Sequence, residues 1–165
     1  MARRFPLSLA VSTVLPVAMV LFMAGPAHAT APKPHQSSFR FTGRVDCGSF
    51  DDRFTDRYSI EGRTFFDHSG KAIRMIDHVR HTSTDRNSVT GLVVHQHDRY
   101  NIVADLQTGI LRISGGLFRI NRAGQGMVIH DVGRVIMDKN GNLIFTAGRH
   151  DVIGKSSKVF CSALD

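Results

Sequence analysis

Hydrophobic and polar residues alternate along most of the chain from residue 39 onward. In the segment FRFTGRV, Phe39, Phe41, Gly43 and Val45 occupy every second position, and arginine or threonine stands between them. A period of two places successive side chains on opposite faces of a β-strand. The segment therefore predicts a half-buried strand.

Similar alternation recurs further along the chain, bounded by short polar stretches that predict turns, among them DHSG at residues 67–70 and STDRN at residues 83–87. It predicts strands over residues 58–66, 71–81, 88–97, 100–106, 110–114, 127–130, 133–138, 143–147 and 158–162. Short strands separated by turn residues are typical of β-sandwiches and β-barrels. The composition agrees, because aspartate outnumbers glutamate thirteen to one and valine, threonine and glycine are frequent. We expect an all-β domain over residues 39–165, a single antiparallel β-barrel or barrel-like sandwich of about 8–10 short strands.

Two dipeptides predict tight hairpin turns. The strongest signal is Asn140-Gly141 within DKNGN, a dipeptide typical of hairpin turns. Gly115-Gly116 predicts a second hairpin, which would place Arg112 opposite Arg119. Like charges in that arrangement repel unless an aspartate or an anionic ligand lies between them. Arg112 and Arg119 are therefore candidates for an anion contact.

The first 29 residues have the pattern of a secretory signal peptide. Arg3 and Arg4 precede an apolar segment, which ends in the A-x-A sequence AHA at residues 27–29. Pro16 and the small residues at the end favour cleavage over a transmembrane anchor. Pro6 stands where a twin-arginine signal usually carries phenylalanine, which favours the general secretory route. The polar residues 30–38 predict a flexible linker before the domain.

The two cysteines, Cys47 and Cys161, lie near the two ends of the predicted domain. An exported protein with an even number of cysteines seldom keeps free thiols, so a disulfide between them is expected. A catalytic or metal-binding pair is the alternative, but the sequence has no C-x-x-C motif. Because the disulfide would join the first strand to the last, a closed barrel is the preferred form.

Basic residues exceed acidic ones, with a net charge of +7 for the full chain and +5 once Arg3 and Arg4 are removed. They are spread along the chain, and no block of five or six occurs. This spread predicts solvated strand faces and argues against nucleic acid as a partner. An anionic cell-wall polymer or lipid is the candidate partner.

Four segments of the chain form a distinctive set: STDRNSVTG, DLQTG, GQGMVIHDVGRVIMDKNGNLIFTAGRHD and FCSALD. Together they resemble a group of small uncharacterised secreted proteins of actinobacteria, over most of the domain. The resemblance implies a secreted, disulfide-containing β-domain. It implies no activity, ligand or catalytic residue.

His95 and His97 are the strongest metal-ligand candidates. On a strand, residues two apart point to one face, and such H-x-H pairs hold metals in several β-folds. His130, on another predicted strand, is a candidate third ligand. Cupin barrels show the nearest pattern, but Asp98 and Asn101 stand where their glutamate ligand is expected. Two surface histidines on an ordinary strand are the alternative, and this is the preferred interpretation.

An acidic segment, DCGSFDDRFTD, offers oxygen ligands for a weak calcium site from Asp46, Asp51, Asp52 and Asp56. Arg53 and Arg57 alternate with these carboxylates. A salt-bridged turn beside the disulfide is therefore preferred over a calcium site.

The sequence contains no nucleophile elbow, zinc-protease helix or phosphate-binding loop. We therefore expect a secreted, non-catalytic binding or cell-envelope interaction module, with no catalytic residue and no cofactor assigned. Two alternatives stay open. One is a small metal-dependent, cupin-like enzyme that uses His95 and His97, and the other is a lipocalin-like carrier of a small apolar ligand.

Overall fold

The computed structural model describes residues 31–155 and 157–165. Its elements are β1 (Lys33–Asp46), β2 (Asp51–Phe66), β3 (Ala72–Asn87), β4 (Val93–Asp105), β5 (Leu111–Arg122), β6 (Gly126–Met137), β7 (Leu143–Arg149) and α1 (Lys158–Ser162). Each strand pairs antiparallel with the next, so the order in the sheet is that of the chain. The prediction of an all-β antiparallel fold is confirmed. The predicted signal peptide lies outside the described residues.

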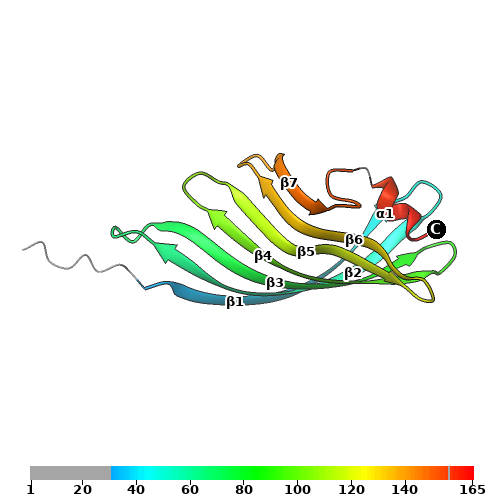
Figure 1. Ribbon diagram of the computed structural model, residues 1–165. Helices are drawn as coiled ribbons and strands as arrows, with labels where there is room; N and C mark the ends of the chain where they lie inside the picture. Colours follow the sequence, from blue (N-terminus) through cyan, green and yellow to red (C-terminus); the bar gives the residue numbers. More distant parts are fainter. Residues whose placement is uncertain (1–30, 156) are drawn as a thin grey trace, which may run out of the picture.

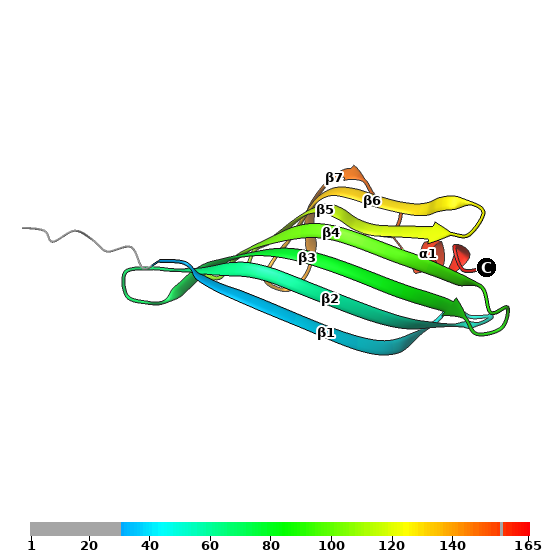
Figure 2. The same ribbon diagram turned by 90° about the horizontal axis from the view of Figure 1, so that it is seen from below.

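The sheet is open, so the predicted closed barrel of 8–10 strands is not confirmed. Figure 1 shows one curved sheet with β1 and β7 at its two edges and α1 on its concave side. Figure 2, seen from below, shows the outer face of the sheet with α1 behind it. In the part of the chain that the structure describes, no helix has the length and apolar composition needed to cross a membrane.

The predicted disulfide is present, but it does not join two strands. Cys47 lies in the turn after β1, and Cys161 lies in α1, with 5.5 Å between their Cα atoms. The expectation of a strand over residues 158–162 is wrong. Phe160, Ala163 and Leu164 follow the spacing of one helix face, and this face packs on the sheet. The disulfide therefore holds α1 against the end of the sheet and does not join the two edge strands.

The strands are fewer and longer than predicted. Residues 33–38, expected as a linker, belong to β1, and the polar stretch STDRN, expected as a turn, belongs to β3. Residues 88–97 and 100–106, expected as two strands, form the single strand β4 with a turn before it. That turn begins at Asn87, whose Oδ1 accepts hydrogen bonds from the backbone N–H groups of Val89 (2.8 Å) and Thr90 (3.0 Å). Such a side-chain turn ends the strand at Asn87.

Gly115-Gly116 is not a hairpin turn but lies in the middle of β5. Gly115 pairs with Tyr100 on one side and Gly133 on the other, and Gly133 pairs with Gly148. A side chain at Gly115 would collide with the backbone of Arg99, since its Cβ would lie 2.6 Å from that carbonyl oxygen. Glycine in a strand interior marks such a close approach or a sharp bend. The row of glycines therefore permits the curvature of β5 to β7.

The hydrophobic core lies under α1, at one end of the concave face. It contains Phe50, Val94, Ile120, Ile129, Cys161, Ala163 and Leu164. Asn87 Nδ2 donates to the backbone oxygen of Leu164 (2.9 Å), and the buried Asp131 accepts hydrogen bonds from the backbone N–H groups of residues 151–153. These contacts hold the C-terminal segment over the inner face of the sheet.

Candidate functional site

A pocket of about 330 Å³ lies between the concave face of the sheet and the C-terminal segment. Two kinds of side chain line it. Aromatic and aliphatic side chains come from Val45, Phe54, Tyr58, Phe118, Val152 and Phe160, and polar ones from Asp52, Asp56, His81, Asp85, Gln96 and Ser157. Mostly apolar walls with a few converging polar groups are typical of small-molecule sites. We call it the inner pocket.

Strand alternation explains why carboxylates face the inner pocket. In β2, Asp52 and Asp56 are buried on the concave face, in phase with Tyr58, whereas Arg53 and Arg57 are exposed on the opposite face. The arginines therefore do not neutralise these carboxylates, and the expectation of a salt-bridged turn is wrong for them.

Asp46 and Asp51, the other two aspartates of the acidic segment, belong to the outer side of the β1–β2 turn. Asp51 Oδ2 lies 3.5 Å from Arg44 Nη1, and Asp46 Oδ1 accepts a hydrogen bond from the backbone N–H of Gly48 (2.7 Å). The β1–β2 turn therefore contains one exposed ion pair, between Arg44 and Asp51, which agrees with the prediction of a salt-bridged turn. The four aspartates do not form one calcium site.

His81 is held between two carboxylates in the floor of the inner pocket. Its Nδ1 lies 3.0 Å from Asp98 Oδ2, and its Nε2 lies 3.2 Å from Asp56 Oδ1. The ring also stacks on Tyr58, with 4.2 Å between the ring centroids. Burial by itself lowers the pKa of His81, but hydrogen bonds to Asp98 and Asp56 outweigh it and raise the pKa above its ordinary value. His81 is therefore the positive centre of a buried charge network.

Asp52 and Asp85 are the two unusual carboxyl groups of this pocket. They are 0% and 4% exposed, and neither Asp52 Oδ2 nor Asp85 Oδ2 has a hydrogen-bond donor among the described residues. Burial raises the pKa of Asp52 to about 6 and that of Asp85 to about 7, and the nearby charge of Asp52 adds to the shift of Asp85. Buried polar atoms without a partner are rare in folded proteins and call for an explanation, such as a bound ligand.

The charge of the inner pocket is negative above neutral pH. Of the described residues that line it, only His81 is basic, and the carboxyl groups of Asp56 and Asp98 already share its charge. Ionised Asp52 and Asp85 would therefore face His81 as the one cationic side chain among the described lining residues, and its charge is already shared with Asp56 and Asp98. The arrangement favours a cation as the missing partner.

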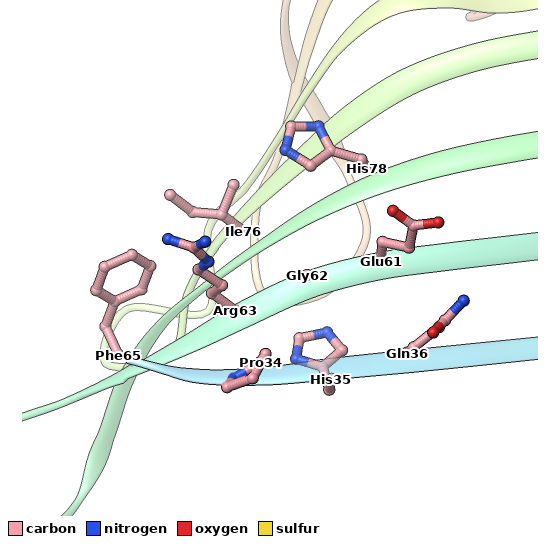
Figure 3. Close-up of a pocket in the computed structure, with 9 residues that line it drawn as sticks. All are labelled: Pro34, His35, Gln36, Glu61, Gly62, Arg63, Phe65, Ile76 and His78. Carbon is pink, nitrogen blue, oxygen red and sulfur yellow. The ribbon is translucent and has the colours of Figure 1, made fainter. Parts of the chain in front are cut away.

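A second hollow, of about 730 Å³, lies at the far end of β1–β3. Figure 3 shows side chains of Glu61, Arg63, Ile76 and His78 around it. Glu61, Arg63 and His78 are exposed and differ in charge. Although this hollow is larger, it has no buried carboxyl group with a raised pKa, so the inner pocket is the better candidate site.

The predicted metal ligands do not come together. His95 and His97 are both exposed on the outer face of β4, and His130 lies on β6, with β5 between the two strands. Across residues 31–155 and 157–165, no group of three or more histidine, cysteine, aspartate or glutamate residues is arranged to hold a metal ion.

The two arginines proposed as an anion contact also lie apart. Arg112 faces Val103 on β4, whereas Arg119 faces His130 on β6. The predicted pairing of Arg112 with Arg119 is wrong, because it depended on a hairpin at Gly115-Gly116 that does not form.

The raised pKa of Asp85 predicts a measurable effect of pH on stability. Between the ordinary aspartate pKa of 3.8 and about 7, the folded protein holds a proton that the unfolded chain releases, so this group makes stability fall as pH rises through that range. Asp85→Asn should remove the effect. We expect the variant to match the wild type near pH 4 and to exceed its free energy of unfolding at pH 8 by roughly 2 to 4 kcal/mol in urea denaturation. A variant less stable than the wild type at pH 8 would contradict the assignment.

Of the inner-pocket carboxylates, Asp52 and Asp56 were predicted only as calcium ligands and Asp85 was not a candidate, although the sequence contained a signal for the pocket. Asp52 and Asp56 are in phase with Phe54 and Tyr58, which indicates that carboxylates and aromatic rings share a face. Comparisons with protein-family models, with curated proteins and with solved structures found no match for this chain.

Proposed function

We propose that this chain is an exported binding module that holds a small organic cation, an amine attached to an apolar group, in the inner pocket. One observation carries the proposal. Two carboxyl groups that line the pocket, Asp52 and Asp85, each have a buried oxygen without a hydrogen-bond partner among the described residues, and aromatic rings lie around them. A protonated amine supplies both the charge and the hydrogen-bond donors that these oxygens lack.

The chemistry of the lining residues suits each part of such a ligand. An ammonium group donates up to three hydrogen bonds, and a hydrogen bond to a charged group contributes about 1.5 to 3 kcal/mol. The ring of Phe54 can attract a cation through its π face, whereas Tyr58 is stacked on His81 and Phe39. Phe118 and Phe160, packed edge to face at 5.7 Å, offer an apolar surface to the rest of the ligand.

Binding is favoured over catalysis because the one histidine among the described lining residues lies between two carboxylates, which raise its pKa and favour its charged form. A protonated imidazole cannot take a proton from a substrate. Export is supported by the predicted signal peptide and by the disulfide, which is compatible with an oxidising compartment.

The test is a calorimetric titration with 2-phenylethylamine, with 2-phenylethanol as the uncharged analogue and phenylacetate as the anionic one. At pH 8 we expect the amine to bind at least tenfold more tightly than the alcohol, and phenylacetate not to bind. At pH 5 the amine should bind more weakly, because Asp52 and Asp85 are then protonated.

Two variants test whether the amine binds beside Asp85 in the inner pocket. Asp85→Asn should weaken amine binding at least tenfold, whereas Glu61→Gln removes an equal charge from an exposed position and should leave binding unchanged. Equal affinity for amine and alcohol, or an equal effect of the two substitutions, would contradict the proposal.

A further inference from the structure

The outer face of β1–β4 forms a regular array of basic and hydroxyl side chains. Its four cross-strand rows are Ser38, Ser59, Arg80 and Arg99; Arg40, Arg57, Thr82 and His97; Thr42, Thr55, Thr84 and His95; and Arg44, Arg53, Arg86 and Val93. We call these sixteen positions the outer grid. They contain seven arginines and no carboxylate.

Strand register brings the arginines together although they are scattered in the sequence. Arg44, Arg53 and Arg86 lie directly opposite one another on three neighbouring strands, and Arg40 lies opposite Arg57. The expectation that basic residues are dispersed over solvated faces is therefore wrong for this surface. Like charges directly across strands repel, so the fold alone gives no reason for this arrangement.

The protein itself hardly neutralises the outer grid. All seven arginines are exposed, and in the described part of the chain only Arg44 has an ion pair, with Asp51 at 3.5 Å. Apart from Asp51, the aspartates of β2 and β3 are buried on the concave side of the sheet. The array therefore presents positive charge to solvent.

We propose that the outer grid binds a hydrophilic linear polymer with repeated phosphodiester groups and no bases. The basic residues of the grid, apart from its two histidines, are all arginine, whose planar fork donates two parallel hydrogen bonds to phosphate. The threonine row lies between two rows that contain arginines, and two serines share the first row with Arg80 and Arg99. These hydroxyl groups can donate to phosphate or to backbone hydroxyls of the polymer. The grid spans about 14 Å across the strands and about 20 Å along them, which suits several successive repeats of an extended chain.

The composition of the grid separates this partner from two other polyanions. Proteins that bind single-stranded nucleic acid stack its bases on aromatic side chains, and the grid contains no phenylalanine, tyrosine or tryptophan. Stable attachment to a membrane surface uses large apolar side chains that enter the lipid, and the only aliphatic residue in the grid is Val93. A base-free, soluble polyphosphodiester fits both observations.

The test measures binding of fluorescently labelled poly(glycerol phosphate) by anisotropy, at several salt concentrations. Arg40→Gln/Arg57→Gln removes one cross-strand pair from the grid. The control, Arg112→Gln/Arg134→Gln, removes the same charge from exposed arginines of β5 and β6. We expect the grid variant to bind at least tenfold more weakly and the control to change affinity less than twofold. Affinity decreases with salt, and the magnitude of the slope of log affinity against log salt concentration should be smaller by roughly 0.7 for each phosphate that the grid variant no longer neutralises.

Three outcomes would overturn the proposal. An equal loss in the two variants would show attraction to net charge alone. Equal affinity for an oligothymidylate with the same number of phosphates would remove the specificity for a base-free chain. Binding to phosphatidylglycerol vesicles but not to the free polymer would make the partner a membrane. All these substitutions lie on the face opposite the inner pocket, so the amine titration remains an independent test of the proposed function.

Discussion

Replacing both Cys47 and Cys161 by serine should lower the free energy of unfolding by about 4 to 5 kcal/mol, because the disulfide closes a very long loop. The two residues are 114 apart in the sequence, and an uncrosslinked chain gains the corresponding conformational freedom when it unfolds. The loss of stability should appear first in α1, because this helix has only five residues and depends on its contacts with the sheet.

Urea denaturation and hydrogen exchange together measure this effect. We expect the double variant to unfold at a lower urea concentration and the amides of residues 158–164 to lose protection before those of β3. Ser49→Ala, in the same β1–β2 turn, is the control and should change stability by less than about 0.5 kcal/mol. A decrease in the free energy of unfolding below about 1 kcal/mol in the double variant, with α1 still protected, would show that the disulfide does not hold α1 against the sheet.

Removal of the Asp98 carboxylate should be nearly as damaging. Asp98 is 2% exposed and accepts hydrogen bonds from His81 Nδ1 (3.0 Å), from the backbone N–H of Arg119 (2.8 Å) and from Gln96 Nε2. Asp98→Ala leaves these donors without an acceptor and His81 with one carboxylate partner. Breaking a buried ion pair in this way costs about 3 to 5 kcal/mol, which we expect to see in urea denaturation at pH 6.

The imidazole titration of His81 separates the charge effect from packing. The raised pKa of His81 means that its ion pairs contribute stability that is fully present below the unfolded histidine pKa and is lost as pH rises through the folded pKa. In Asp98→Asn, an acceptor oxygen remains but the charge is gone, so the pKa of His81 measured by NMR should fall while the loss of stability is smaller than in Asp98→Ala. An unchanged pKa of His81 would contradict the network.

Several features of the fold follow directly from the sequence. Alternation in FRFTGRV places Phe39, Phe41 and Val45 on one face, in agreement with the register of β1 with β2. The predicted half-burial is wrong for Phe39 and Phe41, which are 50% and 45% exposed on this edge strand. The turns at residues 67–70 and 138–142 form where glycine and aspartate predicted them, with hydrogen bonds from Gly70 to Asp67 and from Gly141 to Asp138. These are local effects, which depend on the backbone preferences of a few neighbouring residues.

The features that sequence analysis missed depend on distant parts of the chain. Gly115-Gly116 is a dipeptide typical of hairpin turns. In the structure, position 115 requires glycine because the backbones of β4 and β5 approach closely there. STDRN has the composition of a turn, yet it continues β3, with Ser83 and Asp85 buried and Thr84 between them exposed. Turn propensity could not decide these positions, because burial against neighbouring strands overrides it.

Both proposed sites depend on the same property of strands. Asp52, Arg53, Asp56 and Arg57 look like a mixture of neutralising charges along the chain, but alternation sends the carboxylates to one face and the guanidinium groups to the other. The sheet thus separates an acidic inner pocket from a basic outer grid. Registers between strands, which no single segment specifies, then determine which of these side chains become neighbours.

The central claim is that the inner pocket contains two carboxyl groups poised to receive a cation, and its most direct test is an NMR titration of the side-chain carboxyl carbons of Asp52 and Asp85. In the free protein we predict pKa values of about 6 for Asp52 and about 7 for Asp85, and in the presence of saturating 2-phenylethylamine we predict that both values fall. Titration of both groups near 3.8 in the free protein, or values unchanged by the amine, would contradict the account.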